Sequence, residues 1–568
     1  MTKISLNYEE INPQFIALLA QRGIVEREAV LSFLYPRLDD LPPPQGMKGL
    51  EMAVDLIVGA LTDSREIVIW GDYDVDGTTG TALLITFFRE IGKEVSWHIP
   101  DRLSEGYGLN LEFLRKIGEN LGGAKYLLLT VDCGIANAGE IEEIQTWGID
   151  VIVTDHHQIQ KDNLPSCIIV NPQQEMCGFS HTHLAGVGVV FYLAAGIRAR
   201  LNTLGFFKNR AMPNLKTLLA FVALGSIADM VPLVQTNRIL VRAGLETLEN
   251  SQLPGLSALL RSSDISDGRI FSEDIGFSIG PKLNAAGRMG QADLAVKMLT
   301  CTDKVEAETF AKRLTQLNTT RKDKCTKDLE KALTFIDPIQ VARNRCCIIV
   351  GEFFHGVIGI TASRLVEQLK VPVIVCALTT APEQHKDIQL LKGSCRSIEG
   401  VNIFKALDHC KEYLTAYGGH ALAAGLSLVV DNLSHFKLKV AEYIRSELEL
   451  FKKPVIVKYD IELPIQLALR RNNIETFALL DPFGQGNKKP VFYDGKAVVS
   501  QARVLGQKKE HLLLTFRGSD TNCRGIGFSL GEKIDLVREK GECECIYTLS
   551  SNRYREKLEW QIQILDIW

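Results

Sequence analysis

The chain of 568 residues has no long hydrophobic run. No apolar stretch reaches the roughly 18 residues that cross a bilayer, so a membrane-spanning helix is not expected. The N-terminal segment MTKISLNYEEINPQF also lacks the apolar core of a secretory signal, so we expect no export. The 13 cysteines stand at irregular spacing, and an odd number does not describe a disulfide framework. Together these absences predict a protein of the reducing cytoplasm.

The chain also lacks a strong excess of charge of either sign. Its formal net charge is −4, which excludes a uniformly basic nucleic-acid-binding coat but leaves room for a local basic groove. Apolar residues make up 46% and charged residues 23%, as in ordinary globular proteins. Because the chain is too long for one core, we expect several domains.

The hydrophobic pattern predicts an α/β protein of several parts. After residue 60, short apolar runs alternate with amphipathic stretches, which is typical of a parallel sheet covered by helices. The apolar segment 215–229 predicts one long helix, and the charged segment 305–336 predicts a helix that connects two lobes. Beyond residue 450 the period changes to two, which predicts a small all-β domain of the barrel type. The predicted division is a helical cap at 1–60, an α/β domain at 61–300, the connecting helix at 301–340, a second α/β domain at 341–450 and the β domain at 451–568.

Carboxylates and imidazoles follow several of the predicted strands. They are Asp72, Asp74 and Asp76 after IVIW, Asp132 after YLLLTV, and Asp155, His156 and His157 after DVIVT. The carboxyl ends of parallel strands meet at one edge of a sheet, where ligands of such folds bind. We therefore expect these groups to converge, together with Asp229 at the end of the predicted helix 215–229.

Such a group of acids resists burial unless cations neutralise it, because close carboxylates repel one another. One cation would use only about half of these ligands, so the set fits two cations about 3.5–4 Å apart that share one carboxylate. Mixed carboxylate and imidazole ligands favour Mn²⁺ or Mg²⁺ over thiolate-bound zinc. The reaction that such a pair serves best is hydrolysis of a phosphoester.

Each of these motifs also has a simpler interpretation. The pattern Asp72-x-Asp74-x-Asp76 is similar to the start of a calcium-binding loop, but Leu83 stands where that loop needs its bidentate acid. An Asp before Cys-Gly is often a turn residue, and a His-His pair is often a surface or core feature. The occurrence of all the clusters at strand ends in one chain favours the metal site.

The motifs GDYDVDG, VDCG, TDHH and ADMVP follow one another as in the DHH phosphoesterase superfamily, which this chain resembles. The narrower motifs PDRLSEGYGLN, PKLNAAGRMG, GVIGITASR and GGHALAAG are similar to those of its RecJ branch, over nearly the whole chain. DPFGQGNKKPVF is similar to the start of the oligonucleotide-binding (OB) barrel of that branch. The resemblance implies a parallel-sheet DHH domain, joined by a long helix to a smaller α/β DHHA1 domain and followed by an OB-like β-barrel.

The resemblance also implies roles for the residues of the predicted metal site. The implied metal ligands are Asp74, Asp76, Asp132, His156 and Asp229, with Asp132 as the bridge and Asp72 as either a ligand or a group behind the ligands. His157 is expected to face the scissile phosphate and to neutralise charge in its transition state or assist the leaving oxygen. Asp155 is expected to orient an imidazole.

The DHHA1 domain of this superfamily holds nucleic acid by its phosphates, which implies a second set of residues. The implied contacts are Arg396, Ser394, Gly418, Gly419, His420, Arg288, Arg102 and His355. The glycines of GGHALAAG leave backbone N–H groups open to a phosphate, although they also suit a tight turn. His355 departs from the family pattern, because Trp-His-Gln usually stands where this chain has Phe-Phe-His. A substitute role for His355 and a structural one both stay open.

By resemblance, the function is 5′-to-3′ degradation of single-stranded DNA to 5′-mononucleotides by two-metal hydrolysis, in DNA repair and recombination. The implied cofactors are two Mn²⁺ or Mg²⁺ ions, and the implied partners are single-stranded DNA, a single-stranded-DNA-binding protein and a helicase, with no membrane. A chain of several parts with its own cleft needs no second copy, which favours a monomer. Two alternatives stay open: a phosphodiesterase for short oligonucleotides or cyclic dinucleotides, and a DNA-binding scaffold that has lost the chemistry.

Overall fold

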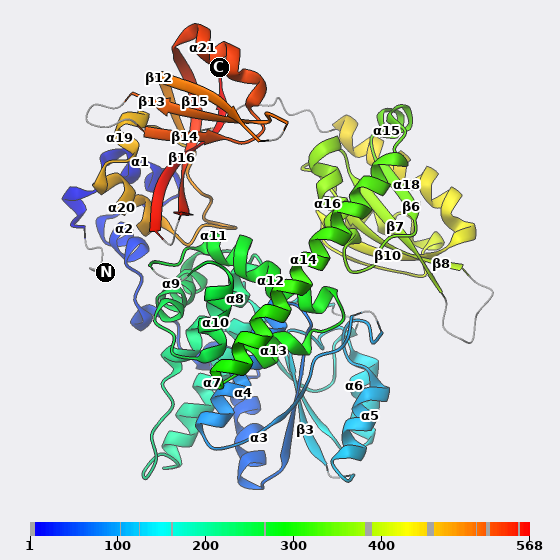
Figure 1. The fold of residues 1–568 in the computed structure, drawn as a ribbon. Coiled ribbons are helices and arrows are strands. Elements are labelled where there is room, and N and C mark those ends of the chain that lie inside the picture. The colour runs from blue at the N-terminus through cyan, green and yellow to red at the C-terminus, as the bar shows by residue number, and fades with distance from the viewer. Residues whose placement is uncertain are drawn as a thin grey trace.

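The helices and strands form three lobes, two of them α/β and the third a β-barrel with the N-terminal helices beside it (Figure 1). This computed structural model describes residues 6–102, 104–123, 125–160, 163–265, 268–380, 389–450, 459–506, 508–517, 523–554 and 557–568. Within these ranges, every helix is too short or too polar to serve as a membrane span.

The first lobe is built on a five-stranded sheet in which all neighbours run parallel, as the hydrophobic pattern predicts. In spatial order the strands are β2 (Ser96–His98), β1 (Glu66–Gly71), β3 (Tyr126–Val131), β4 (Asp150–Thr154) and β5 (Ile168–Val170). Side chains alternate across the sheet: Ile67 and Ile69 enter one core, while Val68 and Trp70 enter another on the opposite face. The two faces are covered by α3 (Leu50–Thr62), α4 (Val75–Glu90) and α7 (Gly186–Thr203) on one side, and by α5 (Leu111–Asn120) and α6 (Ala138–Thr146) on the other.

A helical subdomain completes the first lobe. Its helices are α8 (Leu219–Ala228), α9 (Gln235–Glu249), α10 (Pro254–Ser262), α11 (Ser272–Asp274), a π-helical turn (Ile275–Ile279), α12 (Gly280–Arg288) and α13 (Asp293–Leu299). The prediction of one helix over 215–229 was wrong, because Leu215–Leu218 form a separate 3₁₀ turn before α8. The side chain of Asn214 accepts a hydrogen bond from the N–H of Lys216 and so starts that turn.

The long connecting helix is confirmed as α14 (Lys304–Thr334), which leads to the second lobe. This lobe has a mixed sheet of β6 (Cys347–Gly351), β7 (Val373–Thr380), β8 (Gln389–Arg396), β10 (Ala423–Val429) and β9 (Ala416–Gly419), in that order. Only β6 and β7 run parallel. The helices of the lobe are α15 (Pro338–Asn344), α16 (Ile358–Leu369), α17 (Ile403–Asp408) and α18 (Leu433–Leu450).

The third lobe is a closed barrel, as predicted, but it is not all β. Its strands are β11 (Ile461–Glu462), β12 (Phe492–Leu505), β13 (His511–Phe516), β14 (Cys523–Gly527), β15 (Glu542–Tyr554) and β16 (Lys557–Ile567). The ring closes because β12 pairs with both β13 and β15. The helices that the period-two pattern missed are α19 (Ile465–Ala468), α20 (Arg471–Leu480) and α21 (Ile534–Lys540). Helix α20 is short, and its buried residues Phe477, Leu479 and Leu480 belong to the core of this lobe.

The N-terminal helices α1 (Pro13–Gln21) and α2 (Arg27–Leu34) share one hydrophobic core with the barrel lobe. The rings of Phe15 and Phe492 lie 6.0 Å apart, edge to face. Arg238 of α9 is buried and donates hydrogen bonds to the carbonyl oxygens of Phe33, Leu479 and Leu480. One guanidinium therefore joins the first lobe, the N-terminal helices and the barrel lobe.

Candidate metal centre

Acidic and imidazole side chains converge at the carboxyl edge of the parallel sheet, as the sequence predicts. They extend from the ends of β1, β3 and β4, and Asp229 joins them from the end of α8. Their ligand atoms form three overlapping groups, each of which could hold a cation. Two of the groups are Asp72, Asp74 and Asp132, and Asp76, His156 and Asp229. The third, Asp132, His156 and His157, shares a residue with each of the other two.

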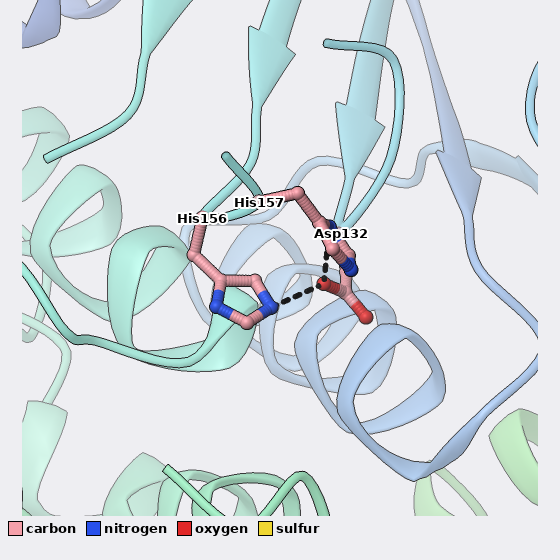
Figure 2. A group of neighbouring side chains, drawn as sticks. All are labelled: Asp132, His156 and His157. Atoms are coloured by element: carbon pink, nitrogen blue, oxygen red, sulfur yellow. Dashed lines mark ion pairs between the residues drawn. The ribbon is translucent and has the colours of Figure 1, made fainter. Parts of the chain in front are cut away.

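Asp132 lies where the two groups meet. Its Oδ1 atom is 3.1 Å from Nε2 of His156, and it is also close enough to Asp72 and Asp74 to share a cation with them. The same Nε2 atom lies 3.7 Å from Oδ2 of Asp76 and 3.6 Å from Oδ2 of Asp229. In Figure 2 the rings of His156 and His157 both turn toward the carboxylate of Asp132. This position is what a carboxylate shared by two cations requires.

Three atoms of this cluster are buried and make no hydrogen bond: Oδ1 of Asp72, Oδ1 of Asp132 and Nε2 of His156. Buried polar atoms are rarely left without a partner, because their desolvation costs about 1–3 kcal/mol each. All three point into one acidic cluster, so a cation supplies the missing partner for each. The residues present therefore fit a pair of divalent cations.

The protonation behaviour of the carboxyl groups leads to the same conclusion. Burial and the neighbouring carboxylates raise the pKa of Asp76 to about 7 and that of Asp229 to about 9. Burial and the same neighbours hold the pKa values of Asp72 and Asp132 well above the ordinary range. Without bound cations these acids retain protons, and bound cations favour their ionised form.

Asp155 is buried and turned toward its own loop and His157. Its Oδ1 accepts hydrogen bonds from the backbone N–H groups of His156 and His157 and lies 2.7 Å from Nδ1 of His157. Its Oδ2 accepts from the N–H of Ile135. With both oxygens occupied in this way, Asp155 orients an imidazole and is not part of either ligand group.

The two adjacent imidazoles differ in their readiness to carry charge. For His157, burial opposes protonation, but the hydrogen bond and charge of Asp155 outweigh it and raise the pKa to about 9. For His156, burial and the charge of His157 lower the pKa to about 4. His156 is therefore neutral, as a metal ligand must be, while His157 is a cation beside the cluster.

Two glycines that the sequence analysis missed allow this close approach. A Cβ atom on Gly186 would lie 2.7 Å from Cβ of Asp132, and one on Gly225 would lie 2.9 Å from Oδ1 of Asp76. The carboxylate of Asp76 also accepts hydrogen bonds from the N–H groups of Gly186 and Val187, at the start of α7. The signal was present in the small residues of LAGVG, but only the packing of α7 on the cluster gives it meaning.

The cluster opens into a cleft of about 1200 Å³ between the two α/β lobes. Asp72, Asp74 and His157 line one wall of it. The lining also includes five of the predicted strand contacts, which are Arg102, Arg288, Gly418, Gly419 and His420. The structure thus places two of the predicted arginines and the glycine motif in the lining of the same cleft as the acids.

Ser394 and Arg396 lie on β8 next to the first turn of α16. The Nη1 atom of Arg396 donates to Oγ of Ser394 at 3.1 Å, and a Cβ on Gly359 would come within 3.0 Å of both side chains. Burial and the charges of Arg102, Arg321 and Arg396 lower the pKa of Arg288 to about 10. Arginines gathered beside a helix N-terminus are a site for an anion.

His355, Ser394 and Arg396 all lie outside the described lining of the cleft. The Nε2 atom of His355 lies 3.2 Å from the carbonyl oxygen of Leu378, while burial lowers the pKa of the ring.

Acidic groups at the edge of a parallel sheet, facing a cleft that arginines also line, are typical of phosphoesterases of the DHH class. The model of the DHH family, N-terminal domain, matches residues 66–226, the DHHA1 domain matches residues 346–446, and the RecJ OB domain matches residues 459–566. The chain belongs to the RecJ family within this class.

The relatives extend over nearly the whole chain. The single-stranded-DNA-specific exonuclease RecJ of Dickeya dadantii is 35% identical over 566 residues, covering 97% of this chain and 95% of its own. That of Bacillus subtilis is 32% identical and covers 98% of this chain and 68% of its own. The crystal structure of RecJ from Thermus thermophilus in complex with Mn²⁺ superposes with a TM-score of 0.78 at 30% identity, covering 98% of this chain and 76% of the other. A structure of the Thermus protein in complex with Mg²⁺ has a TM-score of 0.73.

Proposed function

We propose that this protein is a single-stranded-DNA-specific exonuclease that degrades from the 5′ end and releases 5′-mononucleotides. One observation carries the proposal: two cation-binding groups meet at Asp132 and face the same cleft as a cluster of arginines. The exonuclease activity of the family's named relatives supports it.

The metal ligands in this proposal are Asp72, Asp74 and Asp132 for one cation, and Asp76, His156, Asp229 and the shared Asp132 for the other. Mn²⁺ and Mg²⁺ suit these oxygen and imidazole ligands. When bound, the pair lowers the pKa of water and screens the charge of the phosphate.

His157 acts on the scissile phosphate in this proposal. Its ring is held by Asp155, whose hydrogen bond and charge raise the pKa of the ring and favour its protonated form. A cation at this position neutralises the charge that develops on the phosphate oxygens and can supply a proton to the leaving 3′-oxygen.

Arg102, Arg288, Arg396 and Ser394 receive the 5′-terminal phosphate, together with the first turn of α16 and the open backbone at Gly418, Gly419 and His420. The arginine fork matches the oxygens of a phosphate. A terminal phosphate held across the cleft from the metals fixes which bond is cut, so each cut exposes a new 5′-phosphate for the next. His355 stays a candidate strand contact in this proposal, with its Nε2 atom 3.2 Å from the carbonyl oxygen of Leu378.

The remaining parts of the proposal come from the sequence pattern and from the resemblance. The proposed domains are residues 1–60, 61–300, 301–340, 341–450 and 451–568. The proposed role is in DNA repair and recombination, with single-stranded-DNA-binding protein and a helicase as partners. The protein is proposed to act as a monomer in the cytoplasm. The RecJ OB domain match and the closed barrel favour long strands over the alternative of short oligonucleotides or cyclic dinucleotides.

Digestion of 5′- and 3′-labelled single strands in the presence of Mn²⁺ tests the proposal. We expect early release of the 5′ label as a mononucleotide, slow loss of the 3′ label and little digestion of blunt duplexes. Asp132→Ala should abolish turnover while leaving most of the strand binding. Faster turnover of a dinucleotide than of a long strand would favour the alternative, and unchanged turnover in Asp132→Ala would refute the metal site.

A further inference from the structure

A second groove adjoins the metal-binding cleft on the side of the barrel lobe. It has a volume of about 600 Å³ and shares Ala228, Asn284 and Arg288 with the lining of the cleft. Its other walls come from the π-helical turn, from α14 and from the loop at 483–489 of the barrel lobe. The proposed function fills the cleft with the terminal nucleotide but gives this groove no occupant.

The groove displays two large apolar side chains that nothing covers. Phe277 is 81% exposed and Met230 is 71% exposed, and both line it. Single exposed apolar residues are ordinary on protein surfaces. Two exposed apolar side chains of this size in one groove indicate a binding surface. Met230 also directly follows the proposed ligand Asp229.

The backbone beneath both side chains departs from regular helix. Met230 has a φ of +61° at the position after the end of α8, where helices usually place glycine. Phe277 stands in the π-helical turn, a rare conformation that occurs often at functional sites. A Cβ atom on the neighbouring Gly276 would meet nothing within 4 Å. At Met230, a large side chain is thus kept in a backbone conformation that favours glycine.

The charge of the groove is opposite to that of the whole chain. Its lining contains four cationic side chains, Arg288, Arg321, Lys488 and Lys489, against one carboxylate, Glu273. Glu273 is neutralised by Lys489, whose Nζ atom lies 2.7 Å away. Lys488 is exposed and takes part in none of the ion pairs found among the described residues. A cationic rim around an exposed aromatic ring is the combination that binds a single strand, through its phosphates and through base stacking.

We propose that this groove holds an uncut nucleotide of the strand. The base of that nucleotide stacks on the ring of Phe277, and Met230 contacts the edge of the base. The inference rests on the proposed function and adds to it the route by which the strand leaves the metal centre. The phosphates of the strand in this groove lie along Arg321 and Lys488, while Arg288 at the shared wall stays with the terminal phosphate. Phe277 is a positioning residue, because it holds the strand in register without touching the bond that is cut.

Phe277→Ala tests the inference in the full-length protein with Mn²⁺. Loss of one stacked base should raise the KM for a long 5′-phosphorylated single strand roughly tenfold. The rise should be smaller for a 5′-phosphorylated dinucleotide, which ends before the groove. Phe277→Trp should keep the KM near that of the wild type, whereas Phe277→Leu should resemble the alanine variant. Phe335→Ala removes another exposed phenylalanine, outside both cavities, and serves as the control.

Substrates with one abasic nucleotide at successive positions locate the stacked base. At one position the missing base should raise the wild-type KM about as much as Phe277→Ala does, and should add nothing in that variant.

Met230→Gly relieves the backbone, so it should hold or raise the melting temperature while it also raises the KM. An unchanged KM in Phe277→Ala, an equal rise on the dinucleotide, or additive effects at every abasic position would overturn the inference. These results require a wild type that digests strands, and its failure to do so would instead refute the proposed function.

Discussion

The carboxylate of Asp155 fixes the ring of His157, with Oδ1 2.7 Å from Nδ1, and also accepts the backbone N–H groups of both histidines. This one side chain therefore orients the ring of His157, a proposed catalytic cation, and holds the backbone of His156, a proposed ligand. It explains why an acid in the TDHH motif is buried beside the cluster and yet belongs to neither ligand group.

Asp155→Asn keeps the size of the side chain and removes its charge. We expect kcat to fall about 10- to 100-fold, as is usual for groups that orient a metal ligand or a catalytic base. The KM for the strand should change little, because Asp155 is not among the described residues that line the cleft. Single-turnover measurements with saturating Mn²⁺ check this. A kcat equal to that of the wild type would mean that the interaction does not support the chemistry.

Gly186→Ala introduces a Cβ atom 2.7 Å from Cβ of Asp132. Because α7 and the end of β3 are both packed in the core, Asp132 has to move, and we expect weaker Mn²⁺ binding and a large loss of turnover. Titration with Mn²⁺ measures the affinity. Gly188→Ala is a matched control two residues later, where a Cβ makes only ordinary contacts of 3.5 Å and more. That variant should gain about 0.5–1 kcal/mol of helix stability and keep its activity. Equal activity in the two variants would contradict the close packing.

Arg396→Lys keeps a positive charge beside Ser394 but loses the planar fork. We expect kcat/KM for a 5′-phosphorylated strand to fall about tenfold or more, because hydrogen bonds to a charged group contribute about 1.5–3 kcal/mol. A strand with a 5′-hydroxyl end should lose much less, and it serves as the internal control. If the two substrates lose activity equally, Arg396 does not hold the terminal phosphate.

Removal of the metal should make the stability of the protein depend on pH in a defined direction. The folded-state pKa values of Asp76 and Asp229 are raised from 3.8 to about 7 and about 9. A raised acid contributes stability that is complete below its unfolded pKa and is lost as the pH rises through its folded pKa.

The urea midpoint of the EDTA-treated protein should therefore fall as the pH rises from about 4 to about 9. Mn²⁺ should restore more stability at pH 8 than at pH 5, because the ionised carboxylates bind it. A midpoint of the metal-free protein that rises with pH would contradict the burial of these acids together.

The convergence of the acidic groups could be predicted from the sequence, although they are far apart in the chain, because most of them directly follow a strand. Once IVIW, YLLLTV and DVIVT are parallel neighbours, the residues that follow them have to meet at one edge. Asp229 could be added because it ends an apolar helix. The strand directions of the second lobe could not be predicted, since short apolar runs such as those around Cys347 and Val373 pair equally well either way. The groove at Phe277 was missed because it is formed by segments far apart in the sequence, and the motifs among them, such as PKLNAAGRMG and DPFGQGNKKPVF, do not show by themselves that they meet.

The core shared by the N-terminal helices and the barrel lobe has a consequence for synthesis of the chain. Asn12 donates to Asn473 across 461 residues of sequence, and Phe15, Leu18 and Leu19 are buried in the same core as β12–β16. At about 5–20 residues per second, the ribosome needs roughly 20–90 s after these helices to reach the part of the barrel lobe that covers them. During that time their apolar side chains have no native surface to cover them. The nascent chain is thus prone to aggregation until the barrel lobe has been synthesised. We expect chaperones to bind α1 and α2 during this interval.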